Sequence, residues 1–437
     1  MSLLAFTTGR GAGRRQSHVA PVPAANFPVQ AVHFVDPHFR FQPLPPPNGP
    51  APFRYSLSRL LSTDDINRIT EQKLMVFHTV GDTGDFRGRQ QDFVAEMMRQ
   101  DADALAETHK PAFLYHLGDV VYFAGDIDKY GNNFYETYQD YPGFIVSIPG
   151  NHDCQPDDPQ DGPVDPNKVP LDGWVQNFMS KDPTRLGSLK TNSGRTQLDL
   201  PNVYWTFNTP LATIIGLFSN VGEVEGEIHQ DQIDWFKSEL AAADPELALI
   251  VAVHHPPFSG DTEHSGSTQV FNVLFDSFSA TGRYPHLILS GHVHNYQRFT
   301  TIATAPNGKL QIPCVVAGAG GYTKLGRLHK INGGPPPSPL PLGDDLTLEK
   351  YDQSNFGFLR VEVTDTQITG TYLSAPYSPS GTPPGQIVES FAINLARRTV
   401  RTLQPGGGQN GGNGGGGGAA EPRRPRQPRR PPRPRRR

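Results

Sequence analysis

The chain has 437 residues, 36% of them hydrophobic, and a net charge of −4, which is enough apolar material for one large domain or two smaller ones. No apolar run approaches the ~18 residues of a membrane-spanning helix, and the start, MSLLAFTTGRGAGRRQSH, has arginines but no apolar signal-peptide segment after them. We therefore expect no transmembrane segment and a cytoplasmic location, and the two cysteines, Cys154 and Cys314, cannot form a disulfide framework.

Residues 1–70 are rich in proline and poor in periodicity, as in FQPLPPPNGPAPFRY. This texture predicts an N-terminal extension that either wraps over a domain or stays mobile.

From Lys73 onward the pattern changes to short apolar runs bounded by Gly, Pro or Asn, such as KLMVFHTV, GFIVSIPGN and LALIVAVHH. Such runs predict strands buried on both faces. Helical stretches are expected between them at Gln90 to Ala106, Gln230 to Ala243 and Val270 to Ala280. Near the end, FGFLRVEVTD, QITGTYLSA and QIVESFAINL alternate apolar and polar residues, which predicts antiparallel strands of a second sheet. We therefore expect an α/β domain over 71–400, with two packed mixed β-sheets flanked by helices.

Residues 401–437 form a predicted disordered Gly linker followed by a basic Arg/Pro tail. Residues 421–437 contain nine arginines and one glutamate, a net charge of +8, so the rest of the chain carries −12. The tail has three possible roles. It is a solvated terminus, or it binds nucleic acid or an anionic surface weakly and electrostatically through 423–437, or it folds back over the acidic body. No aromatic residue lies among these arginines, so the sequence does not support base stacking.

Polar motifs follow five of the predicted strands. They are GDTG (81–84), GDVVY (118–122), GNHD (150–153), VAVHHP (251–256) and GHVH (291–294). In open α/β sheets, ligands bind beyond the carboxyl ends of the strands. One such motif alone is usually a turn or a helix cap, but turns do not explain carboxylates, an amide and histidines at successive strand ends. The set predicts a metal site. His292 and His294 are two residues apart, so on an extended segment both would face the metals while Val293 enters the core.

This order of motifs resembles the calcineurin-like metallophosphoesterases and, within them, the purple acid phosphatases, to which GHVHNYQR (291–298) is particularly similar. The resemblance covers roughly Lys73 to Leu395 and implies the four-layer sandwich of that superfamily, with 71–400 as its catalytic domain. It also implies two metal ions. Fe(III) would be held by Asp82, Asp119, Tyr122 and His294, and a divalent Fe, Zn or Mn by Asp119, Asn151, His254 and His292.

Gly84 replaces the histidine that many relatives carry in the first motif, and in the subgroup that this chain resembles a tyrosine at the position of Tyr122 coordinates the metal instead. We expect the glycine to remove a side chain where that phenol must enter. A free phenol has a pKa near 10, so a phenolate ligand implies a trivalent ion that can deprotonate it. The alternative is an aromatic side chain packed under a loop.

His152 and His264 are the candidates for proton donor and phosphate orienter, because the family places histidines at both points. His255 has no expected role. His78, His116 and His286 lie within or beside apolar runs and are expected in the core or as hydrogen-bond supports of the site.

These features predict a dinuclear metallohydrolase that cleaves phosphate monoesters of phosphorylated small molecules with a metal-bound hydroxide. One alternative is a phosphodiesterase acting on nucleotide or lipid head-group diesters, with discrimination in loops such as Gly125 to Tyr141 and Pro156 to Lys190. A further alternative is a non-catalytic binding protein that acts through its basic tail.

Overall fold

The structure is a computed structural model that describes residues 27–31, 44–84, 89–155, 169–181, 195–220, 226–306 and 308–404. These residues belong to one compact unit within Met1–Pro405, and a second unit, Gly406–Arg437, lies outside them. The basic tail and most of the proline-rich extension are therefore outside the described residues, and the domain boundaries stay predictions. Helix α1 (Thr63–Gln72) spans the boundary expected at residue 70.

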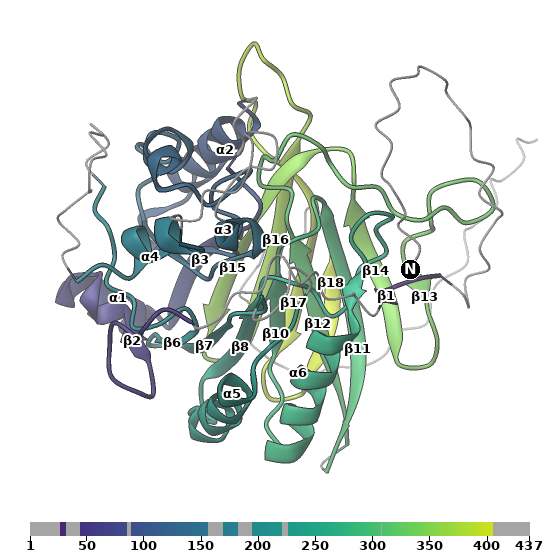
Figure 1. The fold of residues 1–437 in the computed structure, drawn as a ribbon. Helices are drawn as coiled ribbons and strands as arrows, with labels where there is room; N and C mark the ends of the chain where they lie inside the picture. Colours follow the sequence, from purple (N-terminus) through teal and green to yellow (C-terminus); the bar gives the residue numbers. More distant parts are fainter. Residues whose placement is uncertain are drawn as a thin grey trace, which may run out of the picture. The chain divides into compact units, whose positions relative to one another are not determined.

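The larger sheet has nine strands among the described residues (Figure 1). Their order is β13 (Leu340–Pro341), β14 (Leu346–Asp352), β11 (Tyr296–Ala305), β12 (Gly308–Ala317), β10 (Leu287–Ser290), β8 (Ala248–Val253), β7 (Ala212–Leu217), β6 (Trp205–Asn208) and β2 (Arg54–Ser56). The central strands β7, β8, β10 and β12 are parallel, and β11, β14 and β13 continue the sheet in antiparallel fashion. The sheet is thus mixed, as predicted.

The smaller sheet has seven strands in the described part of the chain. Their order is β18 (Thr399–Leu403), β17 (Gln386–Asn394), β16 (Gln367–Ala375), β15 (Phe356–Thr364), β3 (Leu74–Val80), β4 (Phe113–His116) and β5 (Phe144–Ser147). Strands β3, β4 and β5 are parallel, whereas β15 to β18 are antiparallel. The antiparallel strands were expected to form a second sheet, but they extend the sheet of the first three motifs because β15 pairs with β3. The strands of the last two motifs, β8 and β10, lie in the other sheet.

The alternating side chains of β8 show how the layers pack. Ala248, Ile250 and Ala252 belong to the core between the sheets, while Leu249, Val251 and Val253 pack against the helices on the outer face. Those helices are α5 (Gln230–Ala242) and α6 (Thr268–Thr281), and α2 (Gln90–Ala104) packs against β15 of the other sheet. The prediction of two mixed sheets flanked by helices is confirmed.

The expected helices begin or end within two residues of their predicted limits. Helix α6 begins earlier than expected because the Ser267 hydroxyl accepts a hydrogen bond from the Val270 amide at 3.2 Å and caps the helix. The remaining elements are short. They are β1 (Gln30–Ala31), which pairs with β9 (Gly266–Ser267), the helices α3 (Asn151–Cys154) and α4 (Asp172–Phe178), the 3₁₀ turns Leu57–Arg59, Glu107–His109 and Ile127–Lys129, and a π turn at Gly131–Tyr135.

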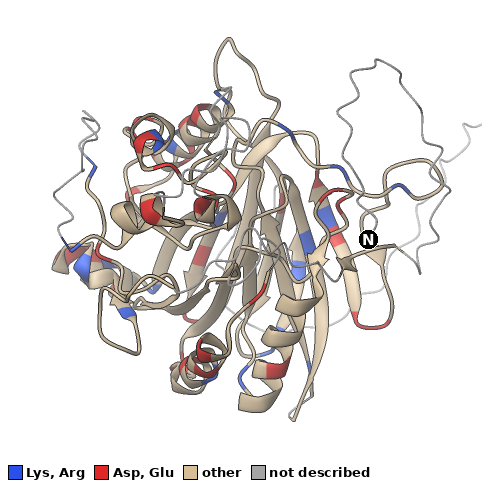
Figure 2. Ribbon diagram, viewed as in Figure 1, with Lys and Arg blue, Asp and Glu red and all other residues tan. Residues whose placement is uncertain are grey.

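Charged residues lie mainly outside the central strands (Figure 2). Strands β6, β7, β8 and β10 contain no charged residue, as expected for strands covered on both faces. Among the described residues, no helix has both the length and the apolar character needed to cross a bilayer.

Candidate metal centre

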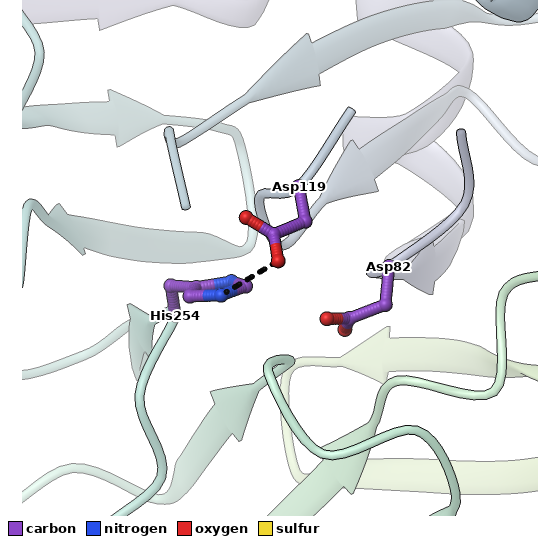
Figure 3. A group of neighbouring side chains, drawn as sticks. All are labelled: Asp82, Asp119 and His254. Atoms are coloured by element: carbon purple, nitrogen blue, oxygen red, sulfur yellow. Dashed lines mark ion pairs between the residues drawn. The ribbon is translucent and has the colours of Figure 1, made fainter. Parts of the chain in front are cut away.

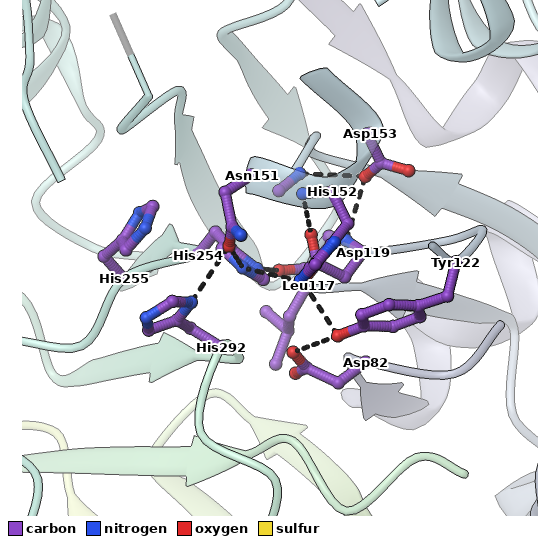
Figure 4. A network of polar contacts seen from close by, with 12 residues as sticks. Asp82, Leu117, Asp119, Tyr122, Asn151, His152, Asp153, His254, His255 and His292 are labelled. Carbon is purple, nitrogen blue, oxygen red and sulfur yellow. Dashed lines mark hydrogen bonds and ion pairs between the residues drawn. The ribbon is translucent and has the colours of Figure 1, made fainter. Parts of the chain in front are cut away.

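The five predicted motifs converge on one buried site, although they come from two different sheets (Figure 4). The segments after β3, β4 and β5 carry Asp82, Asp119, Tyr122 and Asn151, the last of which begins the short helix α3. The loops after β8 and β10 carry His254, His292 and His294. Within each sheet these strands are parallel, so their carboxyl ends share one edge. Packing the two sheets face to face then brings the two sets of loops together.

One group of side chains surrounds the Tyr122 hydroxyl. The Tyr122 hydroxyl oxygen lies 2.8 Å from Asp119 Oδ2, 3.2 Å from Asp82 Oδ1 and 3.1 Å from His294 Nε2. His294 Nε2 is also 3.6 Å from Asp82 Oδ1. The other three residues predicted to hold the first ion therefore all contact the Tyr122 hydroxyl.

A second group surrounds the Asn151 side-chain oxygen. This atom lies 3.0 Å from His254 Nε2 and 2.9 Å from His292 Nδ1. His254 Nε2 is in turn 3.4 Å from Asp119 Oδ2 (Figure 3). The four residues predicted to hold the second ion are thus also together, and Asp119 belongs to both groups.

Two buried polar atoms in these groups have no hydrogen-bond partner among the described residues, Asp82 Oδ2 and His292 Nε2. Buried polar groups are rarely left unsatisfied, because each costs about 1–3 kcal/mol. Ligand atoms of Asp82, Asp119 and His254 also all lie within 4.8 Å of one another. A carboxylate oxygen and an imidazole nitrogen are both good ligands for transition metals, so the residues fit a metal site.

The electrostatics of the site agree with this fit. Burial, helped by neighbouring histidines, lowers the pKa of both His292 and His294 well below the usual value. The rings are therefore neutral, which is the form that binds metals. Burial and the charge of Asp119 raise the pKa of Asp82. Burial opposes ionisation of Asp119 too, but His254, His152 and hydrogen bonds outweigh it, so the pKa of Asp119 is lowered.

Tyr122 lies in surroundings that favour the neutral phenol. Burial and the charges of Asp119 and Asp82 raise its pKa well above the usual value. Deprotonation of this hydroxyl would therefore require a strongly charged cation beside it.

The segment that carries His292 and His294 differs from the prediction. His292 has a φ of 66°, and residues 292–295 form bends between β10 and β11, so the segment is not extended. Val293 enters the core as expected, but His292 and His294 reach different groups because the backbone turns between them. Asp82 and Asp119 also have positive φ, at 60° and 54°. Backbone conformations of this kind cost energy and concentrate at functional sites.

Gly84 is required by a backbone contact. A Cβ at this position would lie 2.3 Å from the Val120 oxygen and 2.6 Å from the Val121 Cα. The nearest atoms are therefore the backbone of the segment that leads to Tyr122, and not its phenol ring. Glycine lets this segment approach closely enough for the Tyr122 amide to donate to the Gly84 carbonyl at 3.0 Å.

Two further residues support the site without having been predicted to do so. Asp153 accepts hydrogen bonds from the amides of Asp119, Val120 and Gly150 at 2.9–3.0 Å, so it ties the second motif to the third. The sequence could have indicated this role, because Asp153 is part of the predicted motif GNHD. The Tyr322 ring stacks on that of Tyr122 with centroids 4.1 Å apart, and nothing in GAGGY indicated this contact.

His152 and His264 both lie beside the two groups and are partly exposed. The His152 amide donates to Asp119 Oδ1 at 2.8 Å, and its ring centroid is 4.4 Å from that of Tyr122. The His264 ring lies 4.7 Å from His292 and 5.4 Å from His294, measured between centroids. Their positions allow the predicted roles, which remain predictions.

The other histidines have structural partners. His255 Nδ1 lies 2.8 Å from the Ser219 hydroxyl, and its ring is next to His292. His116 contacts the Thr83 hydroxyl at 2.9 Å, so it supports the first motif. His78 pairs with Asp101 at 3.0 Å, and His286 accepts from the Leu249 amide at 2.9 Å.

The chain is similar in sequence to parts of a phosphatase and of a probable phosphodiesterase. The chain is 25% identical over 169 residues to Purple acid phosphatase 22 of Arabidopsis thaliana, covering 38% of this chain and 35% of that protein. It is 30% identical over 164 residues to a Probable cyclic nucleotide phosphodiesterase of Rhodococcus erythropolis, covering 37% of this chain and 50% of that protein. The matched segment thus spans half or less of these curated relatives.

The solved structure of the purple acid phosphatase PPD1 from yellow lupin (Lupinus luteus) superposes with a TM-score of 0.50 at 18% identity. The match covers 74% of this chain and 54% of that one, and it indicates a shared fold. The family model described as calcineurin-like phosphoesterase matches residues 75–296, slightly more than half of the chain. This range contains every residue of the two groups, and the chain belongs to the calcineurin-like phosphoesterase family.

Proposed function

We propose that the protein is a dinuclear metal-dependent hydrolase of phosphate monoesters, similar to acid phosphatases. The observation that carries this proposal is the position of Asp119, whose carboxylate contacts both the Tyr122 group and His254 of the Asn151 group. One carboxylate shared by two sets of metal-binding side chains is the arrangement that a pair of bridged ions requires.

The first ion would be held by Asp82, Asp119, Tyr122 and His294, and the second by Asp119, Asn151, His254 and His292. When bound, the two ions would supply an activated water and offset the negative charge of the phosphoryl oxygens. We propose Fe(III) in the first position, because the raised pKa of Tyr122 requires a strongly acidic ion if its oxygen is to bind as phenolate. The second ion would be divalent Fe, Zn or Mn.

The protein's own groups would orient the phosphate and protonate the leaving oxygen. His152 is held by two contacts, its amide to Asp119 and its Nδ1 to the Phe123 carbonyl at 2.7 Å. The second contact makes Nδ1 the protonated nitrogen and leaves Nε2 to meet the phosphate. His264, next to His292 and His294, would donate its proton to the leaving oxygen.

Metal analysis of the purified protein, combined with assays on p-nitrophenyl phosphate and its bis ester, tests the proposal. We expect two metal ions per chain, one of them iron, activity that a chelator abolishes and metals restore, and faster cleavage of the monoester. Tyr122→Phe should remove a visible charge-transfer band. An active protein that is free of iron would refute the iron assignment, and activity that survives complete chelation would refute the metal mechanism.

A diesterase is the second candidate, because the Rhodococcus erythropolis relative bears the name of a cyclic nucleotide phosphodiesterase. Of the two loops expected to discriminate, Gly125 to Tyr141 is described, whereas most of Pro156 to Lys190 lies outside the described residues. Faster cleavage of the bis ester than of the monoester would favour this candidate.

A further inference from the structure

Asp261 lies in the loop after β8 that also carries His264, and it is 1% exposed. Its Oδ1 accepts hydrogen bonds from the amides of Glu263 at 2.8 Å and His264 at 3.1 Å. This carboxylate oxygen therefore fixes the backbone of His264 itself.

The other oxygen of Asp261 contacts the segment that carries the predicted metal ligands. Oδ2 accepts a hydrogen bond at 3.0 Å from the side-chain amide of Asn295, the residue directly after His294. A Cβ at Gly326 would lie 2.3 Å from the same oxygen, so glycine is needed for the close packing there. The Gly326 amide in turn donates to the His294 carbonyl at 2.9 Å.

Gln297 closes this network and fixes the orientation of Asn295. Its Nε2 donates to Asn295 Oδ1 at 2.9 Å and to the Ser259 hydroxyl at 3.1 Å, and its Oε1 accepts from the Gly260 amide at 2.8 Å. Asn295 and Gln297 are both fully buried. If the Asn295 amide were flipped, it would lose both its bond to Gln297 and its bond to Asp261, so its donor points at Asp261.

We propose that Asp261 is a positioning residue that fixes the His264 ring over the pair His292 and His294 through its bond to Asn295, so that His264 can protonate the leaving oxygen. This inference rests on the proposed function. The two segments are connected directly: the His264 amide donates to Asp261, and Asp261 accepts from Asn295, the residue after His294.

The chemistry of the leaving group separates this role from a purely structural one. A nitrophenolate leaves readily without a proton, whereas an alkoxide requires protonation as the bond breaks. Loss of a well-placed proton donor therefore slows alkyl phosphates far more than p-nitrophenyl phosphate. A variant that merely unfolds or loses metal slows both substrates by the same factor.

The test uses Asp261→Asn, in which one oxygen still accepts from Glu263 and His264 but an NH₂ group now faces the NH₂ of Asn295. General acids contribute about 10²–10⁴-fold. We therefore expect kcat/KM for an alkyl phosphate such as β-glycerophosphate to fall at least about 10-fold, and that for p-nitrophenyl phosphate to fall by less than about 3-fold. Metal content should equal that of the wild type.

The reciprocal double variant, Asp261→Asn together with Asn295→Asp, again places a hydrogen-bond donor opposite an acceptor and keeps the net charge. It should recover the wild-type ratio of the two rates, whereas Asn295→Asp alone places two carboxylates together and should not. Glu263→Gln is the control in the same loop, because the Glu263 side chain pairs on the surface with Lys324 at 2.5 Å and is 55% exposed. Hydrogen exchange of the peptide that contains 259–265 gives a readout that needs no metal, and it should be faster in Asp261→Asn and normal in the reciprocal variant.

Equal losses of kcat/KM on both substrates in Asp261→Asn would overturn the inference. A reciprocal variant that fails to recover either the wild-type rate ratio or the wild-type hydrogen exchange would also overturn it. A wild-type protein that cleaves no phosphate ester would refute the proposed function instead. In that case unchanged loop exchange in Asp261→Asn would still overturn the positional link on its own.

Discussion

Replacement of Gly84 by alanine tests how the chain brings Tyr122 into the site. The added Cβ would lie 2.3 Å from the Val120 oxygen, and ordinary contacts of this kind begin at 3.4 Å, so the backbone must move by about 1 Å. Gly84 does not have a positive φ, so the penalty is steric and not conformational. Overpacking of this kind destabilises a protein by about 1–3 kcal/mol. Alanine also lowers the conformational entropy of the unfolded chain, which offsets about 0.4–1 kcal/mol of this loss. We expect a net loss of up to about 2.6 kcal/mol, with a midpoint of about 1.3 kcal/mol.

The same displacement should weaken the metal site. The Tyr122 amide bonds to the Gly84 carbonyl, so a shift of this segment moves the phenol away from Asp82 and His294. Urea unfolding measures the stability loss, and, under the proposed iron assignment, the charge-transfer band measures whether the phenol still binds the metal. Gly334→Ala is the matched control, because the nearest atom to its Cβ would be 3.9 Å away. If Gly84→Ala matched this control in both measurements, the reasoning would be refuted.

Two further predictions concern stability. Glu389→Gln breaks a buried pair in which Arg298 binds both carboxylate oxygens at 2.8–2.9 Å, and it should cost about 3 kcal/mol or more in urea unfolding. Lys309→Ala, at an exposed pair, should cost less than about 1 kcal/mol, and equal losses would contradict the argument. Burial and the nearby Arg398 lower the pKa of His286 to about 3. The unfolded chain then binds a proton that the folded protein does not, so stability should fall as the pH drops from about 6.5 toward 3, by up to about 1.4 kcal/mol per unit. His286→Gln should flatten this slope in unfolding curves, and an unchanged slope would contradict the assignment.

The sequence alone determined the type of fold and several of its strands, and it predicted a set of site residues that the structure brings together. Buried strands read as continuous apolar runs whether or not their partners are known, and KLMVFHTV and LALIVAVHH became β3 and β8. The polar motifs after them were recognisable for the same local reason, since a strand that ends in Gly-Asp or Gly-His places that side chain at the edge of its sheet. The helices α2 and α5 likewise followed from local periodicity.

Only the tertiary structure decided how these pieces meet. Periodicity does not say which strands pair, so the division of the five motifs between two sheets could not be read from the sequence. The turn at His292, the backbone contact that requires Gly84 and the bond from Asp261 to Asn295 all depend on segments far apart in the chain. Local sequence encodes the conformation of a segment, whereas the distance between two loops depends on how whole sheets pack, and that packing is decided by the sum of many weak apolar contacts.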